Sequence, residues 1–93
     1  MSRRAARTDA NQQEIISAIR DAGYFCVDTH NLGNGFPDLL CVNNYGQTIL
    51  FEVKTANGRL TEAELKFHRD YHGALKIVRS AEMALEYLGM RWE

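Results

Sequence analysis

Residues 35–54 constrain the fold of this chain more than any other stretch, because their pattern predicts a β-hairpin together with its register. Two apolar runs flank the turn-forming sequence Asn-Asn-Tyr-Gly at residues 43–46. A type I turn followed by a left-handed Gly46 closes a three-residue loop of this kind and pairs Asn43 with Gln47. The pairing of the residues further along both strands then follows by counting outward.

The two expected strands, 39–42 and 48–53, end on a pair of opposed acids, Asp38 and Glu52. The pairs nearer the turn are apolar, namely Cys41 with Ile49, Leu40 with Leu50, and Leu39 with Phe51. Directly opposed β-carbons lie about 5 Å apart, where two like charges destabilise a sheet. Lys54 follows Glu52 by two residues and therefore lies on the same face of the strand. The hairpin thus predicts a cluster of two carboxylates and one ammonium group.

This cluster allows two interpretations. Carboxylate oxygens bind hard divalent cations, and Mg²⁺ in particular is held by one or two carboxylates, with water and substrate phosphate completing its octahedron. A surface salt bridge between Lys54 and the acids is the alternative. The strand that carries Glu52 is otherwise almost wholly apolar, as is typical of a strand buried on both faces, and a charge is placed there only with compensation. The sequence therefore favours a metal site for phosphate chemistry.

The residues around this cluster resemble a known family. They are Gly35, Pro37 and Asp38, then Glu52, Val53 and Lys54, and then Gly58, Leu60 and Thr61 before a helix. In this combination and spacing they resemble the virus-type replication-repair nuclease (VRR-NUC) domain, which belongs to the PD-(D/E)XK nuclease superfamily. The likeness extends from Glu14 to Val78, which is nearly the whole chain.

The resemblance implies a restriction-endonuclease-like core with a metal-dependent nuclease site. It implies that Asp38, Glu52 and Lys54 are catalytic, and that the two acids, with the backbone carbonyl of Val53, hold one or two Mg²⁺ or Mn²⁺ ions. Glu14 has two open roles, because a first-helix glutamate reaches the metal in the family, whereas a glutamate in the first helical turn also caps the helix. We expect Lys54 to orient the attacking water and stabilise charge rather than to act as a general base.

The first half of the chain also predicts a helix, a strand and a loop. The helix is expected to begin between Asp9 and Asn11, where two capping boxes are available, and to end at Gly23, and the strand follows at 24–28. The glycine-rich loop 29–36 has no helix behind it, which excludes a P-loop. Its glycines are expected either to let the backbone approach DNA or to turn the chain sharply into the next strand.

In the second half, Thr61 and Glu64 form a full capping box for a helix that ends at Gly73. A strand at 75–78 and a last helix capped by Ser80 complete the chain. The order is helix, three strands, helix, strand, helix, which predicts an α/β fold with a mixed central sheet flanked by helices. A glutamine often stands near the position of Glu64 in the resembling family, and capping is the stronger interpretation of the glutamate found here.

Several polar side chains are candidates for contacts with DNA. Arg59, Lys66 and Arg69 lie on or beside the helix that starts at Thr61, where they either bind backbone phosphates or are simply solvated. Three further side chains either line DNA or pack within the fold, namely His68, Tyr71 and His72, with packing favoured for Tyr71.

The length and charge of the chain limit the number of domains and the way in which it can bind DNA. Ninety-three residues, 45% of them hydrophobic and 25% charged, form one globular domain, 1–93. Residues 1–8 carry three arginines and are expected to be a short basic arm, either a frayed terminus or a phosphate contact. A net charge of −1 is unusual for a nucleic-acid-binding domain, so DNA binding requires the basic residues to cluster on one face.

The cysteines and the apolar segments bear on metal type and location. Cys26 and Cys41 lack the spacing of zinc ligands and are expected to be small buried hydrophobes. Trp92 is expected either on the core or at a dimer contact. No apolar run makes a signal peptide or a membrane span, so we expect an intracellular, cytoplasmic protein with no membrane partner. The family resemblance implies a bacterial or viral origin.

Together these features predict a metal-dependent, structure-specific DNA endonuclease. No recognisable helix motif reads base edges, so the target is expected to be DNA of a particular shape. Stand-alone members of the resembling family suggest a homodimer that resolves four-way (Holliday) junctions, because two-fold symmetry presents two sites to paired strands. Two alternatives stay open: a flap or nicking nuclease of the same superfamily, and a non-catalytic nucleic-acid-binding module.

Overall fold

The structure is a computed structural model that describes residues 3–93, with side chains from residue 10 onward. Its elements in chain order are α1 (Arg3–Asp21), β1 (Cys26–Asp28), the 3₁₀ helix η1 (His30–Leu32), β2 (Leu39–Val42), β3 (Thr48–Val53), α2 (Glu62–Asp70), β4 (Leu75–Val78) and α3 (Ala81–Leu88). The strands form one sheet in the order β1-β2-β3-β4, with β1, β2 and β3 antiparallel and β4 parallel to β3. The predicted α/β fold with three helices and a mixed sheet is confirmed.

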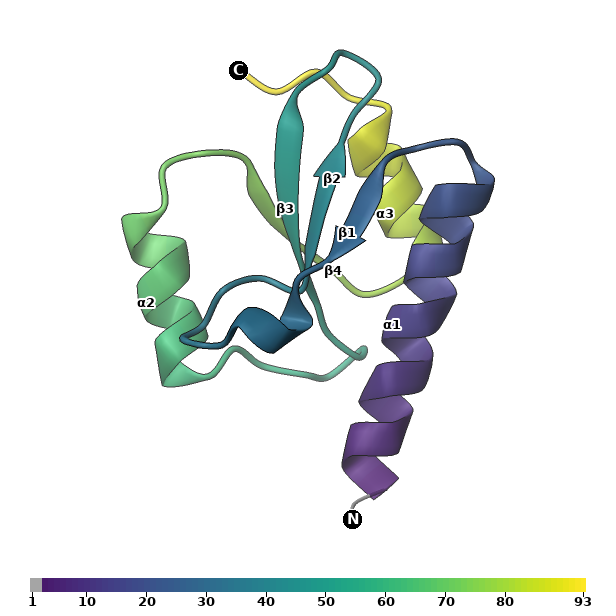
Figure 1. The fold of residues 1–93 in the computed structure, drawn as a ribbon. Helices are drawn as coiled ribbons and strands as arrows, with labels where there is room; N and C mark the ends of the chain where they lie inside the picture. The colour runs from purple at the N-terminus through teal and green to yellow at the C-terminus, as the bar shows by residue number, and fades with distance from the viewer. Residues whose placement is uncertain (1–2) are drawn as a thin grey trace.

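The helices cover both sides of this sheet. Figure 1 shows α2 on one side and α1 with α3 on the other. α2 connects β3 to β4, as expected because parallel neighbours need a crossover connection. Each side chain of β3 therefore points either toward α2 or toward the layer of α1 and α3.

The hairpin between β2 and β3 has the predicted turn and register. Asn43 donates its backbone N–H to the carbonyl of Gln47 at 2.9 Å, and Gly46 is left-handed with φ of 77°. The Asn43 side chain also accepts from the backbone N–H groups of Tyr45 and Gln47. The strand pairs are those predicted, Leu39 with Phe51, Leu40 with Leu50 and Cys41 with Ile49.

The prediction for the start of the first helix was wrong. α1 begins at Arg3, so residues 3–8 of the expected basic arm are helical turns, while residues 1 and 2 lie outside the described part of the chain. An arginine- and alanine-rich segment has high helix propensity and carries the helix past the expected caps. Asn11 and Gln12 consequently lie inside the helix and bond to other elements: Asn11 Nδ2 donates to the Lys54 carbonyl, and Gln12 Nε2 donates to Asp28 Oδ1.

The caps of the two later helices agree with the sequence. Thr61 and Glu64 form the predicted reciprocal capping box of α2. The Ser80 hydroxyl accepts from the Met83 N–H at the start of α3. β1 is shorter than the predicted strand, because only Cys26–Asp28 pair with β2.

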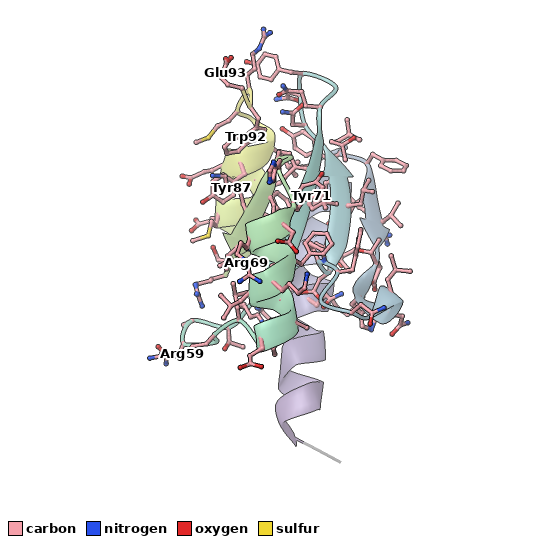
Figure 2. The ribbon with its side chains drawn as sticks, turned by 90° about the vertical axis from the view of Figure 1, so that its left-hand side faces the viewer. Arg59, Arg69, Tyr71, Tyr87, Trp92 and Glu93 are labelled. Atoms are coloured by element: carbon pink, nitrogen blue, oxygen red, sulfur yellow. The ribbon has the colours of Figure 1, made fainter. Side chains whose placement is uncertain are left out.

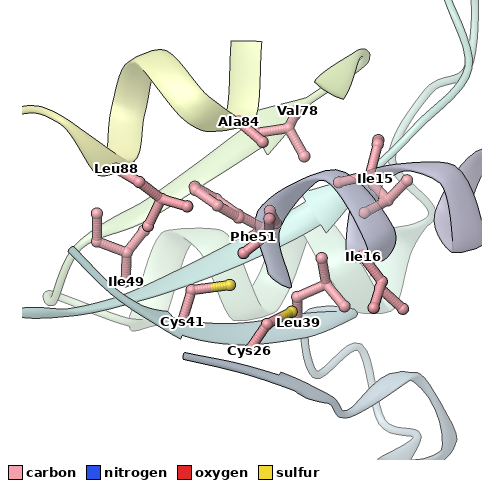
Figure 3. Close-up of a cluster of buried hydrophobic side chains, with 12 residues drawn as sticks. Ile15, Ile16, Cys26, Leu39, Cys41, Ile49, Phe51, Val78, Ala84 and Leu88 are labelled. Carbon is pink, nitrogen blue, oxygen red and sulfur yellow. The ribbon is translucent and has the colours of Figure 1, made fainter. Parts of the chain in front are cut away.

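The hydrophobic core lies between the sheet and the layer of α1 and α3. Figure 3 shows the side chains of the core converging from these elements, among them Ile15, Ile16, Cys26, Leu39, Cys41, Ile49, Phe51, Val78, Ala84 and Leu88. Cys26 and Cys41 are free and buried, as predicted. Trp92 packs against this core beside Tyr87, with Lys76 over its ring. No helix in the described part of the chain is long and apolar enough to cross a membrane.

Candidate active site

The two acids meet where β2 begins and β3 ends. Asp38 comes immediately before β2, and its backbone N–H donates to the Phe51 carbonyl at 2.9 Å. Its Oδ2 accepts the backbone N–H of Val53 at 2.8 Å, which turns the carboxyl toward β3. Glu52 projects from the face of β3 that α2 covers, whereas its neighbour Phe51 points to the core on the other face of the sheet. The two carboxyl groups are neighbours, since that of Asp38 raises the pKa of Glu52. Asp38 itself lies outside the strand ladder, which ends at the pair Leu39 with Phe51.

The ladder between β2 and β3 ends just before the two acids. Its last pair is Leu39 with Phe51, and the Asp38 N–H donates to the carbonyl of Phe51 as well. Pro37 is fully buried, and its carbonyl accepts from the Thr29 hydroxyl at 2.8 Å. Asp38 therefore contacts β3 beyond the last strand pair through its backbone N–H and its side chain.

Glu52 is an unusual buried acid. Its side chain is only 1% exposed, and Oε1 has no hydrogen-bond partner among the described residues. Burial, and then the neighbouring carboxyls of Asp38 and Glu64, raise the pKa of Glu52 to about 10. Glu52 therefore carries a proton in the metal-free protein at neutral pH. A buried polar atom without a partner costs about 1–3 kcal/mol, so this arrangement does not serve stability.

Lys54 links β3 to α2 through an ion pair. Its Nζ lies 2.8 Å from Oε1 of Glu64 and 3.9 Å from Oε2 of Glu52. Burial opposes ionisation of Glu64, but the hydrogen bonds from Lys54 and from the Thr61 backbone outweigh it and lower the pKa of this carboxyl. Glu64 thus caps α2 and fixes the ammonium group of Lys54, so the predicted capping role is confirmed, and a contact with the site is added.

Sequence reasoning did not single out His68 as a site residue. Its Nε2 lies 3.9 Å from Oε1 of Glu52 and is likewise buried without a hydrogen-bond partner among the described residues. Burial lowers the pKa of His68, so the ring is neutral at pH 7. The signal in the sequence was the helical spacing, because Glu64 and His68 are one turn apart and occupy the same face of α2.

Comparisons of the chain with protein-family models, with curated proteins and with solved structures found no match. The chemistry of the site is therefore interpreted from its own residues.

The loop before Asp38 positions α2 over the site. A β-carbon added to Gly35 would lie 2.3 Å from the carbonyl oxygen of Ala63, in the first turn of α2, and Gly35 is left-handed with φ of 78°. Phe36 then packs edge-on against Phe67, with ring centroids 5.2 Å apart. The glycine at this position lets the loop approach the helix backbone, which differs from the expected approach to DNA.

Arg79 holds the segment that follows Lys54. Its guanidinium donates to three backbone carbonyls, those of Thr55 at 2.6 Å, Ala56 at 3.3 Å and Gly58 at 2.9 Å. A planar guanidinium with several fixed donors suits this kind of convergent carbonyl binding. Because Arg79 directly follows β4, it ties the turn after β3 to the neighbouring parallel strand.

The remaining candidates are exposed side chains. Glu14 is exposed on α1, and the carboxyls that raise the pKa of Glu52 are those of Asp38 and Glu64, so its metal role stays a prediction. The predicted DNA contacts, Arg59, Lys66 and Arg69, are all exposed. Figure 2 shows Arg59 and Arg69 around α2, on the side of the molecule that this helix covers. Lys66 pairs with Asp70 at 2.7 Å on the surface of α2.

The donor set fits a hard dication with an incomplete protein shell. Within residues 10–93, whose side chains are described, no group of three or more His, Cys, Asp or Glu side chains is placed so that it could hold a metal ion, so any site here depends on fewer side chains. Asp38 and Glu52 offer carboxylate oxygens, and the Val53 carbonyl lies at the same end of β3. Mg²⁺ is held in this way, by one or two carboxylates with water and substrate phosphate. The unpartnered Oε1 of Glu52 and its neutral carboxyl are consistent with a group that ionises when a cation binds.

Proposed function

We propose that the protein is a metal-dependent endonuclease that hydrolyses phosphodiester bonds in DNA. The observation that carries the proposal is the buried Glu52 beside Asp38, with Lys54 following on the same strand. Such a carboxyl is costly to bury, and its Oε1 has no hydrogen-bond partner among the described residues. Perturbed acids gathered at one end of a strand are typical of functional sites.

Each residue has a distinct role in the proposed reaction. Asp38, Glu52 and the Val53 carbonyl would hold one or two Mg²⁺ or Mn²⁺ ions, with Glu14 as a further ligand by family resemblance. A metal held there would supply Lewis-acid chemistry that activates water and offsets charge on the phosphate. Lys54, held by Glu64, presents its ammonium group to the attacking water and the phosphate oxygens, where it orients and stabilises charge. Glu52 would give up its proton to solvent in order to serve as a ligand.

The proposed substrate is branched DNA, bound by a homodimer. The residues that resemble the VRR-NUC domain, from Gly35 to Thr61, all contribute to the loop, hairpin and helix start around the site, and the element order is compatible with a restriction-endonuclease-like core. Stand-alone members of that family suggest four-way junctions as the target, because a two-fold axis presents two sites to paired strands. Arg59, Lys66 and Arg69 on the α2 side are the proposed phosphate contacts.

The test is cleavage of labelled junction, flap, nicked and linear duplexes in Mg²⁺ and in Mn²⁺. We expect junction cleavage by the wild type, and a loss of about 100-fold or more in Glu52→Gln and in Lys54→Met. Glu62→Gln is the matched control, because Glu62 is an exposed acid in the first turn of α2. If the protein is a monomer that prefers flaps or nicks, the substrate is a flap or a nick and not a four-way junction. DNA binding that persists in chelator, with no cleavage in either metal, contradicts the nuclease and supports a binding module.

A further inference from the structure

Two buried polar atoms face one another across the site without a bond. Oε1 of Glu52 and Nε2 of His68 are 3.9 Å apart, which is beyond hydrogen-bond length, and neither has a partner among the described residues. Buried polar atoms in folded proteins are nearly always paired. A donor and an acceptor that lie so close together without partners indicate a second arrangement of the side chains in which they form a hydrogen bond.

The part of α2 that carries His68 is held in place by its neighbours. His68 lies one turn after Glu64, which is fixed by the Thr61 backbone and by Lys54. The preceding residue, Phe67, packs on Phe36 at 5.2 Å and on Tyr71 at 5.5 Å between ring centroids. The helix backbone at His68 is therefore fixed relative to β3, and a movement of the two side chains would close the gap between them.

We propose that His68 is a positioning residue for Glu52, donating its Nε2–H to Oε1. The inference rests on the proposed metal site. The two atoms are buried without partners and lie 3.9 Å apart, so a shift of about 1 Å would bring them within hydrogen-bond distance. A bond at Oε1 would orient the carboxyl so that Oε2, the oxygen nearer Lys54, is left to bind a dication. Hydrogen bonds of this kind to metal ligands typically change metal affinity by 10- to 100-fold.

The experiment measures metal affinity by titration calorimetry, independently of cleavage. Mn²⁺ and Mg²⁺ are titrated into the wild type and into His68→Phe and His68→Gln. Phenylalanine keeps a ring for packing but has no donor, whereas glutamine has an N–H donor at similar reach. We expect both ions to bind about 10- to 100-fold more weakly to His68→Phe, and His68→Gln to recover most of that loss. His72→Ala, an exposed histidine, is the matched control and should bind as the wild type does.

Each other outcome has a defined meaning. Equal affinity of His68→Phe and the wild type overturns the positioning role and leaves the metal site intact. A loss confined to Mn²⁺ overturns it too, because imidazole nitrogen is a ligand that Mn²⁺ accepts more readily than Mg²⁺. Absence of binding to the wild type refutes the proposed function and this inference together. Should His68→Phe fail to fold, as judged by circular dichroism, His68→Leu without a donor replaces it with the same expected loss.

Discussion

Replacing Glu52 by glutamine is expected to stabilise the metal-free protein at neutral pH. The carboxyl is buried and protonated in the folded state, with a pKa of about 10, whereas in the unfolded chain it has its ordinary value of 4.5. Glutamine has nearly the same shape and no charge to lose. The substitution therefore removes the cost of protonating this group on folding.

The sign and size of the effect follow from proton linkage. Below pH 4.5 Glu52 is protonated in both states and contributes no pH dependence. Between pH 4.5 and about 10 the unfolded state is ionised and the folded state is not, so wild-type stability falls as pH rises. Each pH unit in this window costs about 1.4 kcal/mol. The advantage of Glu52→Gln should thus be small at pH 5 and reach about 3 kcal/mol at pH 7, a Tm rise on the order of 10 °C.

The assay is urea unfolding of both proteins in chelator from pH 5 to pH 8. Taking the difference between the two proteins cancels groups that titrate alike in both. Glu62→Gln is the control, because an exposed glutamate should give a difference that does not grow with pH. A Glu52→Gln protein that is no more stable than the wild type at pH 7, or whose advantage is constant with pH, would falsify the reasoning about burial.

Adding metal should reverse the order. A cation that binds only the folded wild type stabilises it by mass action, by about 4.1 kcal/mol at a concentration of 1,000 times its Kd, which exceeds the advantage of about 3 kcal/mol that the variant has at pH 7. Glu52→Gln lacks the ligand charge and should gain much less. Without metal, the variant is expected to be more stable than the wild type although it is inactive, as is common when a functional site costs stability.

Two further changes test the supports around the site. Gly35→Ala should lower the free energy of unfolding by at least about 2 kcal/mol, because its backbone is left-handed and the new β-carbon would lie 2.3 Å from a carbonyl oxygen of α2. Gly46→Ala is the control, since Gly46 has φ of 77° and nothing within 4 Å, and it should lose only the conformational part, about 1 kcal/mol. Urea unfolding measures both losses. Equal losses would contradict the close approach. Arg79→Ala should cost about 1–3 kcal/mol and make the chain at 55–58 more sensitive to limited proteolysis, because three carbonyls lose their donor; unchanged proteolysis there would refute the role of Arg79.

Local rules made the hairpin predictable. A three-residue turn with a left-handed Gly46 determines the register, and the two-residue period of a strand then determines which side chains share a face. That Lys54 lies near Glu52 follows from this period, whereas the position of Asp38 also depends on its bonds to Phe51 and Val53 beyond the last strand pair. The capping box at Thr61 was predictable for the same reason, since its partners are three residues apart.

Long-range contacts could not be predicted in this way. Asn11 has the sequence signature of a helix cap, yet it lies inside α1 and binds the carbonyl of Lys54, 43 residues away. Gly35 is required by the backbone of α2, which only the packed structure brings near. For Glu64 the sequence favoured capping over a contact with the site, and its ion pair with Lys54 appears only in the packed structure.

The amino-acid sequence by itself determined the hairpin of β2 and β3 and the caps of α2 and α3, because each depends on interactions between residues close in sequence or related by a fixed period. The tertiary structure decided the electrostatics of the site. Packing α2 against the open end of β3 buries Glu52, brings His68 within 3.9 Å of it and directs Lys54 to Glu64. Burial and the distances between charges depend on how separate elements pack in space, so local sequence patterns do not predict them.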